Sequence, residues 1–319
     1  METIMLSHPH QLKKENIRET VIALGFFDGV HLGHQQVIKT AKQLAEQKQM
    51  QSAVMTFSPH PKEILRGQSE KLDYLSPLPE KSKLIEEIGV DVLYVIQFTQ
   101  DFANLTPQQF VDDYLIGLNV KHVVAGFDYS YGKLGKGTME TLPFHSRKAF
   151  TQTTISKVEN QQEKVSSTYI RNLLTSGDVA SIPPVLGRYY EVKGTVVHGE
   201  KRGRQIGFPT ANIDTERYFL PTTGVYAVCL KVKNRTYEGV CNIGYKPTFH
   251  DNKSYKSVEV HLFDFDDQIY NEKVIIQWID RIRSEKKFNS IEELVEQIHQ
   301  DKEKAKLILN KINMCSCNL

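Results

Sequence analysis

The stretch Gly25-Phe26-Phe27-Asp28-Gly29-Val30-His31-Leu32-Gly33-His34 decides how the first half of the chain folds. It follows an apolar run at 21–24, and after it apolar residues recur with helical spacing from Val37 to Ala45. A glycine-rich turn between a buried strand and a helix is typical of α/β domains, whose ligands bind outside the carboxyl ends of the strands. The free N–H groups and positive dipole of the helix N-terminus favour phosphate at this turn.

Further strand-helix units follow the first one. Apolar runs at 53–57, 92–96 and 122–125 have the near-continuous hydrophobicity of strands that are covered on both faces. A helix is predicted to start at Thr106, with Thr106 as the N-cap, a proline in the first turn and Gln109 completing a capping box. Together these units predict a Rossmann-like, doubly wound α/β domain with a parallel sheet.

The pattern changes after Gly177. Pro183-Pro184 predicts a stiff break, beyond which strand-like runs are separated by clusters of Gly, Asn, Asp and Pro. A helix with one apolar face and a capping box is predicted to start at Ser290. We therefore expect an antiparallel β-barrel with a C-terminal helix, and two domains at 1–182 and 183–319. The predicted barrel strands are 190–197, 225–232, 237–243, 258–263 and 274–279.

The composition excludes several classes of partner. The 319 residues carry 40 basic and 38 acidic side chains, a net charge of +2, so no global field selects nucleic acid or anionic lipid. The N-terminus lacks the regions of a signal peptide, and no apolar run approaches the roughly 20 residues that span a bilayer. We expect a cytoplasmic protein with small-molecule substrates and no nucleic-acid or membrane partner. The oligomeric state is left open.

His31 and His34 are the candidate catalytic residues of the first half. Three positions apart, they can point to one side of the first helical turn. Two imidazoles beside a triphosphate can donate hydrogen bonds to the α-phosphate and to the leaving pyrophosphate, so the pattern indicates nucleotidyl transfer. The alternative is a tight glycine-rich turn with two surface histidines.

A second glycine-rich loop leaves the strand that ends near Val197. Gly199, Gly203, Arg204 and Gly207 lie in this basic loop, which suits a backbone wrapped around phosphates. The alternative is an ordinary glycine-rich β-turn.

Glu259 lies in an alternating strand, on the same face as His261. Phosphoryl transfer to a hydroxyl needs a base or an orienting acceptor within hydrogen-bond reach, and Glu259 is the candidate. Alternation alone favours a solvated face of the strand over a catalytic role for Glu259.

These motifs resemble a known family. The stretch 25–34 resembles the H-x-G-H nucleotidyltransferase superfamily and, more closely, the bacterial bifunctional riboflavin kinase/FMN adenylyltransferases. Three further segments carry the resemblance: Thr-Phe-Ser-Pro-His-Pro at 56–61, Gly-Phe-Asp-Tyr-Ser-Tyr-Gly at 126–132, and Val-Ser-Ser-Thr-Tyr-Ile-Arg at 165–171. Gly-Phe-Pro-Thr-Ala-Asn at 207–212 resembles the signature of riboflavin kinases. The resemblance covers nearly the whole chain.

For the first half, the resemblance implies an FMN adenylyltransferase site. Flavin contacts are implied for His60 and Pro61, and a nucleotide or metal contact for Asp128. Ser167 also suits a helix N-cap, and Arg171 a solvated helix face. The residues implied in ATP binding are Gly25, Phe27, Asp28, Gly33, Asp128, Ser167, Thr168 and Arg171.

For the second half, the resemblance implies a riboflavin kinase site. Thr210 and Asn212 are the implied ligands of a Mg²⁺ ion that bridges ATP phosphates, and oxygen ligands suit this hard cation. Glu259 is the implied catalytic residue. Arg283 is an implied flavin or nucleotide contact, or else part of an ordinary charged loop. The residues implied in ATP binding are Gly199, Gly203, Arg204 and Gly207.

The implied activity is ATP-dependent phosphorylation of riboflavin to FMN, followed by adenylylation of FMN to FAD with release of pyrophosphate. ATP and Mg²⁺ serve both steps. Ser58, Tyr129 and Tyr131 depart from the family pattern, which leaves a kinase with a weak or silent adenylyltransferase half as the nearest alternative. A flavin-binding regulatory protein is the alternative from another class.

Overall fold

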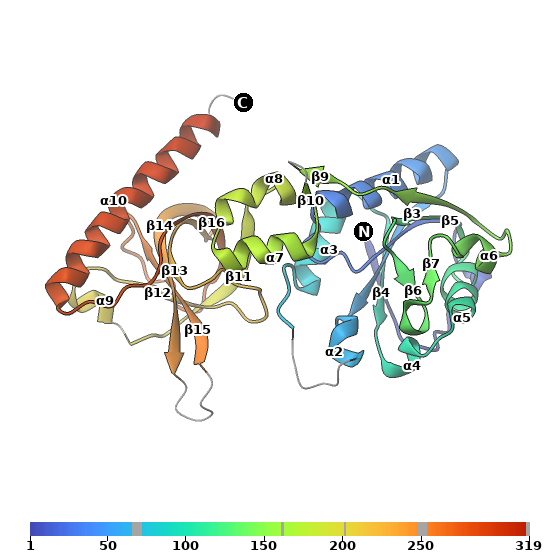
Figure 1. The fold of residues 1–319 in the computed structure, drawn as a ribbon, viewed down its shortest axis with the longest axis horizontal. Helices are drawn as coiled ribbons and strands as arrows, with labels where there is room; N and C mark the ends of the chain where they lie inside the picture. The colour runs from blue at the N-terminus through green and yellow to red at the C-terminus, as the bar shows by residue number, and fades with distance from the viewer. Residues whose placement is uncertain (66–71, 161–162, 201, 248–253, 317–319) are drawn as a thin grey trace. The chain divides into compact units, whose positions relative to one another are not determined.

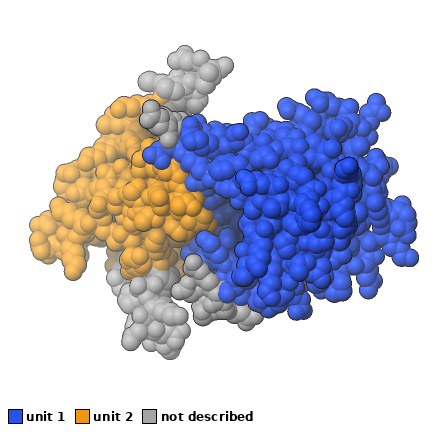
Figure 2. All heavy atoms as spheres, turned by 45° about the vertical axis from the view of Figure 1, so that its right-hand side comes forward, with its two compact units in different colours: residues 1–167 blue, residues 168–319 orange. Residues whose placement is uncertain are grey.

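The computed structural model describes residues 1–65, 72–160, 163–200, 202–247 and 254–316. The chain separates into two compact units, residues 1–167 and 168–319, which are coloured separately in Figure 2. The fold of each unit is described below by itself.

Helix α7 (Ser167–Ser176) starts where the two units divide and groups mainly with the second. Its Leu174 carbonyl accepts a hydrogen bond from Thr222 N at 2.9 Å, and its Ser176 carbonyl accepts one from Arg281 Nη1 at 3.2 Å. The predicted domain boundary after residue 182 lies beyond this helix. It stays a prediction about which fragment folds alone.

The first unit contains a six-stranded parallel sheet in the order β1-β4-β3-β2-β5-β8 (Figure 1). The predicted α/β fold is therefore confirmed. The four interior strands are those that the apolar runs predicted. Sequence reasoning missed both edge strands, because the sequences Glu-Thr-Ile-Met-Leu and Thr-Gln-Thr-Thr-Ile bury few side chains. The strands are β1 (Glu2–Leu6), β2 (Thr20–Leu24), β3 (Gln51–Ser58), β4 (Val92–Gln97), β5 (Val120–Gly126) and β8 (Thr151–Ile155).

Both faces of this sheet are covered. Successive residues of β2 belong to different hydrophobic clusters: Ile22 and Leu24 to one, Val21 and Ala23 to the other. This double coverage explains the near-continuous apolar runs of the interior strands. The helices are η1 (Lys14–Asn16), α1 (Leu32–Lys48), α2 (Pro61–Leu65), α3 (Leu78–Glu87), α4 (Gln100–Ala103), α5 (Pro107–Val111), η2 (Asp112–Ile116), η3 (Lys133–Gly135) and α6 (Leu142–Ser146). The short strands are β6 (Ser130–Tyr131), β7 (Gly137–Thr138), β9 (Glu159–Asn160) and β10 (Glu163–Lys164).

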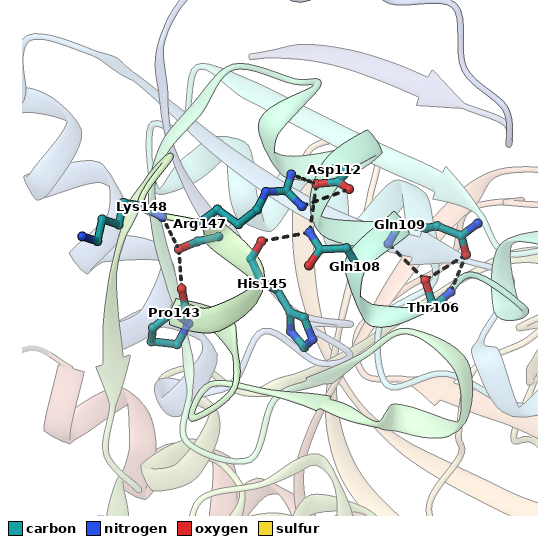
Figure 3. A network of polar contacts seen from close by, with 9 residues as sticks. Thr106, Gln108, Gln109, Asp112, Pro143, His145, Arg147 and Lys148 are labelled. Atoms are coloured by element: carbon teal, nitrogen blue, oxygen red, sulfur yellow. Dashed lines mark hydrogen bonds and ion pairs between the residues drawn. The ribbon is translucent and has the colours of Figure 1, made fainter.

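A polar network joins α5 and η2 to α6 (Figure 3). The predicted capping box at Thr106 and Gln109 is present at the start of α5. Gln108 Nε2 donates to Asp112 Oδ1 and to the His145 carbonyl, both at 3.0 Å, and Arg147 pairs with Asp112. His145 Nδ1 also lies 2.8 Å from the hydroxyl of Tyr131, so the network extends to the short strand β6.

The second unit contains a closed antiparallel barrel in the order β11-β12-β15-β14-β13-β16 (Figure 1), which confirms the predicted barrel. Sequence reasoning missed β12, because this four-residue strand has one buried side chain. The strands are β11 (Tyr190–Val197), β12 (Ala211–Asp214), β13 (Gly224–Val232), β14 (Arg235–Pro247), β15 (Ser254–Leu262) and β16 (Lys273–Arg283).

The prediction of a stiff break at Pro183-Pro184 is wrong. These prolines begin the short helix α8 (Pro183–Leu186), where their missing N–H groups leave no helical hydrogen bond unmade. The 3₁₀ helix η4 (Val179–Ser181) precedes α8, and helix α9 (Arg202–Gln205) lies in the glycine-rich loop.

Helix α10 (Ile291–Ser316), the longest of the described helices, packs against the barrel. Its Ala305 and Leu309 join Ala227, Phe263 and Ile279 in one buried cluster. No helix in the described part of the chain combines the length and the apolar character needed to cross a membrane.

Candidate active sites

The signature loop places its two histidines against each other. Strand β2 ends at Leu24, and His31 is the N-cap of α1. His31 Nδ1 accepts a hydrogen bond from His34 N at 3.2 Å, and the two imidazole rings stack with centroids 3.5 Å apart. The structure therefore brings both candidate catalytic residues to one side of the first helical turn.

His34 has an unusual electrostatic environment. Burial lowers the pKa of its imidazole well below the ordinary value, and the nearby His31 and Lys81 lower it further. The ring is therefore neutral near pH 7. Its Nδ1 is buried and has no hydrogen-bond partner among the described residues. A neutral imidazole retains one N–H group that can be donated to a phosphate oxygen.

Gly33 provides the space that the stacked arrangement needs. A Cβ at this position would lie 3.2 Å from the His31 ring, closer than about nine in ten real Cβ contacts. Gly25 and Phe27 occupy the turn before His31, with Phe27 buried.

Asp28 lies inside the loop. Its carboxylate accepts hydrogen bonds from Leu75 N at 3.2 Å and Ser76 N at 3.0 Å, and its side chain is almost fully buried. The Ser167 hydroxyl donates to the Asp28 carbonyl at 2.8 Å. Both residues thus hold the loop in place, while their implied contacts with ATP stay predictions.

The end of β3 lies beside the signature loop. The His60 ring packs edge-on against the Phe26 ring with centroids 4.2 Å apart, and Pro61 begins α2. The implied flavin contacts of His60 and Pro61 are therefore near the histidine motif, and they stay predictions.

Asp128 is exposed and pairs with Lys164 at 2.6 Å. Such a surface pair contributes little stability, so a ligand could replace it at small cost. Thr168 and Arg171 belong to the second unit, on α7, where the Arg171 guanidinium lies 5.6 Å from the Phe219 ring centroid. Their contacts with nucleotide stay predictions.

Sequence reasoning missed Lys81 on α3. Its side chain is almost fully buried, and its Nζ donates to the Phe26 carbonyl at 2.7 Å and to Thr56 Oγ1 at 3.2 Å. Burial lowers its pKa to about 8, against the opposing effect of Asp28. Helical spacing could have indicated its burial, because Lys81 lies four residues before Ile85, on the buried face of the helix.

The second unit contains a pocket of about 400 Å³. Strands β13, β14, β15 and β16 contribute to its wall, together with helix α10, the segment that follows β16 and the loop that contains α9. Of the predicted site residues, Gly203, Thr210, Glu259 and Arg283 line this pocket.

Glu259 lies between two asparagines. It is the register partner of Asn212 on β12 and of Asn242 on β14, so the three side chains share one face of the barrel sheet. Both Glu259 and Asn242 line the pocket. The strand face that could have been merely solvated is a pocket wall, and the catalytic role of Glu259 stays a prediction.

Thr210 and Asn212 fit a hard cation. Both offer side-chain oxygens, which Mg²⁺ prefers. A Cβ at Gly199 would lie 2.2 Å from the Asn212 side-chain amide, and a Cβ at Gly203 would lie 2.2 Å from the Phe208 carbonyl. Gly199 therefore leaves room for the Asn212 side chain, and Gly203 leaves room for the Phe208 carbonyl, two residues before Thr210.

Arg283 has a partner that the sequence did not reveal. Its Nε donates to both Asp301 carboxylate oxygens, at 3.0 and 2.9 Å, and its Nη2 lies 2.8 Å from Asp301 Oδ2. Its Nη1 donates to the Ser284 carbonyl at 3.0 Å. Arg283 thus fastens the segment after β16 to α10.

Arg204 and Gly207 lie further along the glycine-rich loop. Arg204 is exposed, and its Nη2 lies 3.4 Å from the Tyr270 hydroxyl. Gly207 has a positive φ of 84°. Their phosphate contacts stay predictions.

A parallel-sheet unit with an H-x-G-H turn and a barrel with a Glu-lined pocket define a two-domain protein of the nucleotidyltransferase and kinase types. The family model described as FAD synthetase matches residues 13–169, and the one described as riboflavin kinase matches residues 186–309. The bifunctional riboflavin kinase/FMN adenylyltransferase of Bacillus subtilis is 53% identical over 307 residues, which are 96% of this chain and 97% of the relative. The protein of the same name from Listeria monocytogenes is 47% identical, over 98% and 99% of the two chains.

The chain belongs to the bifunctional riboflavin kinase/FMN adenylyltransferase family. A crystal structure from Streptococcus pneumoniae, described as a macrolide-efflux protein, matches it with a TM-score of 0.85 and 34% identity, over 96% of this chain and 99% of the other. That description concerns the pneumococcal protein, and the likeness here supports a shared fold. The family resemblance of the motifs is confirmed.

Proposed function

We propose that the second unit phosphorylates riboflavin to FMN and that the first unit adenylylates FMN to FAD, each reaction consuming ATP. The membership of the chain in the family supports both activities. The observation that carries the division of labour is the separation of the two candidate sites, with His31 and His34 in one unit and Glu259 in the other.

In the kinase step, Glu259 accepts or orients the proton of the terminal ribityl hydroxyl of riboflavin. That oxygen then attacks the γ-phosphorus of ATP, and ADP leaves. The position of Glu259 in the pocket wall, between Asn212 and Asn242, supports this role because polar groups on both sides can hold its carboxylate in place.

In the adenylylation step, a phosphate oxygen of FMN attacks the α-phosphorus of a second ATP, and pyrophosphate leaves. His31 and His34 donate hydrogen bonds to the phosphate oxygens on which charge accumulates. Their stacking at the start of α1 supports this role, because the helix dipole favours anions at the same point. No covalent enzyme intermediate is needed.

Thr210 and Asn212 would hold a Mg²⁺ ion in the kinase unit, with ATP phosphates as further ligands. When bound, the ion neutralises phosphate charge during transfer. We place the enzyme in the cytoplasm, where ATP is available to both reactions.

One assay tests the proposal. The purified chain is incubated with riboflavin, ATP and Mg²⁺, and the flavins are separated by chromatography. FMN should form first and FAD after it, and supplied FMN should be converted to FAD without riboflavin. Formation of FMN without FAD would leave only the kinase, and formation of neither product would refute both assignments.

A further inference from the structure

The signature loop contains two residues in strained backbone conformations. Phe27 has a φ of 56° and Val30 a φ of 42°, both in the left-handed region that favours glycine. For a β-branched or bulky residue this conformation is a genuine outlier, and it persists only when surrounding contacts hold it. Asp28 supplies one such contact through its bonds to the backbone of Leu75 and Ser76. Lys81 supplies another at the beginning of the turn.

Lys81 helps to hold one peptide group in its observed direction. Its Nζ donates to the Phe26 carbonyl at 2.7 Å and lies 3.9 Å from the centroid of the Phe26 ring. Because the peptide unit is planar and trans, the N–H of Phe27 points away from that carbonyl. This N–H forms no hydrogen bond with another residue of the described part of the chain. This donor lies in the turn that leads to α1, whose N-terminus favours anions.

Lys81 is not needed to satisfy the buried carbonyl. The Thr56 hydroxyl also donates to the Phe26 carbonyl, at 2.8 Å, so this oxygen keeps a partner without the lysine. The described hydrogen-bond acceptors of the ammonium are neutral oxygens, and its pKa is lowered despite the opposing effect of Asp28, so its burial is costly to the fold. Packing and hydrogen-bond satisfaction therefore do not explain a lysine at this position.

We propose that Lys81 is a positioning residue for adenylylation: its buried ammonium fixes the Phe26–Phe27 peptide so that the Phe27 N–H faces the nucleotide phosphates. Its positive charge adds to the field that the start of α1 offers to these phosphates. The proposal rests on the adenylyltransferase function proposed for the first unit.

The test compares Lys81→Met with Lys83→Met, because Lys83 is an exposed lysine on the same helix. With FMN, ATP and Mg²⁺, Lys81→Met should lower the kcat/KM of adenylylation by about 10- to 100-fold, because the Phe27 N–H is misplaced but not removed, and removal of one preorganised donor costs about 100- to 1000-fold. Lys83→Met should leave it unchanged. Phosphorylation of riboflavin by the same preparations should not change, and the Tm of Lys81→Met should not fall. If the methionine variant does not fold, Lys81→Gln takes its place in a pH profile, because its amide can still donate to the Phe26 carbonyl but does not titrate.

A pH profile separates this role from a merely structural one. Because burial lowers the pKa of Lys81 to about 8, the kcat/KM of the wild-type chain should fall as the pH rises above about 8, when the ammonium loses its proton. Lys81→Met should lack this alkaline fall. The charged or titratable groups close to the ammonium or to its contacts include Asp28, His31, His34, His60 and Tyr74.

Three results would overturn the proposal: equal adenylylation by Lys81→Met and Lys83→Met, an alkaline fall that persists in Lys81→Met, or a parallel loss of both activities with a lowered Tm. A wild-type chain that cannot convert FMN to FAD would instead overturn the function proposed for the first unit.

Discussion

The ion pair between Arg283 and Asp301 gives the sharpest stability prediction. The Asp301 side chain is 3% exposed and that of Arg283 is 19% exposed, so Asp301→Asn leaves a largely buried guanidinium without its counterion. Breaking a fully buried pair in this way costs about 3–5 kcal/mol. Because Arg283 retains some solvent contact and its bond to the Ser284 carbonyl, we expect about 2–3 kcal/mol.

Trp278 reports on this change directly. It is the single tryptophan of the chain and lies fully buried on β16, the strand that ends at Arg283. Its fluorescence therefore follows the unfolding of the barrel unit alone, and a loss of this size lowers the Tm by about 5–10 °C. The KM for riboflavin in the kinase step should also rise, because the segment fastened by Arg283 lines the pocket.

Glu303→Gln is the matched control on the same helix. It removes an exposed pair with Lys306, whose contribution should stay within about 0.5 kcal/mol. Equal Tm values for Asp301→Asn and Glu303→Gln would refute the reasoning. So would an Asp301→Asn variant whose adenylylation of supplied FMN is impaired as much as its phosphorylation of riboflavin.

Three further predictions concern catalysis. Glu259→Gln should slow riboflavin phosphorylation by about 100-fold while FMN adenylylation continues. A near-wild-type kinase rate would show that Glu259 has no catalytic role. The double variant His31→Ala, His34→Ala should accumulate FMN without forming FAD, and persistent FAD synthesis would remove both histidines from the mechanism. Gly199→Ala should displace the Asn212 amide, which the new methyl group would approach to 2.2 Å, and lower the kinase rate by about 10-fold or more at fixed Mg²⁺. An unchanged rate and Mg²⁺ requirement would show that Asn212 need not hold its position.

The sequence predicts the interior of the fold better than its edges. Interior strands such as β2 and β3 are covered on both faces, and burial on two sides leaves a continuous apolar run in the sequence. Edge strands such as β1 and β8 need only one partner and tolerate Thr, Gln and Glu, so they leave no such run. Pro183-Pro184 was misread because the same dipeptide suits a rigid break and a helix N-terminus, which only the surrounding structure distinguishes.

In the candidate sites, too, the sequence predicts local contacts better than contacts between distant residues. His31 and His34 lie three residues apart, so local helical geometry alone brings them together. Asp301 lies 18 residues from its partner Arg283, and Lys81 lies 55 residues from the carbonyl that it contacts. Tertiary packing makes these contacts, and no short motif in the sequence encodes them.

Lys81 and Asp301 are both buried charged residues next to a candidate site, yet their removal should change the stability of the fold in opposite directions. Asp301→Asn leaves the Arg283 guanidinium largely buried without its counterion, so the fold is destabilised. Lys81→Met removes the charge itself, the Phe26 carbonyl still accepts a hydrogen bond from Thr56, and the Asp28 carboxylate keeps its bonds from two backbone N–H groups. For Lys81 the folded-state pKa of about 8 lies below the ordinary value of 10.5, so at pH values below about 8 the fold carries the full penalty of burying the ammonium. Methionine removes this penalty, and a Tm that stays level or rises while adenylylation falls would separate what Lys81 does for the reaction from what it does for the fold.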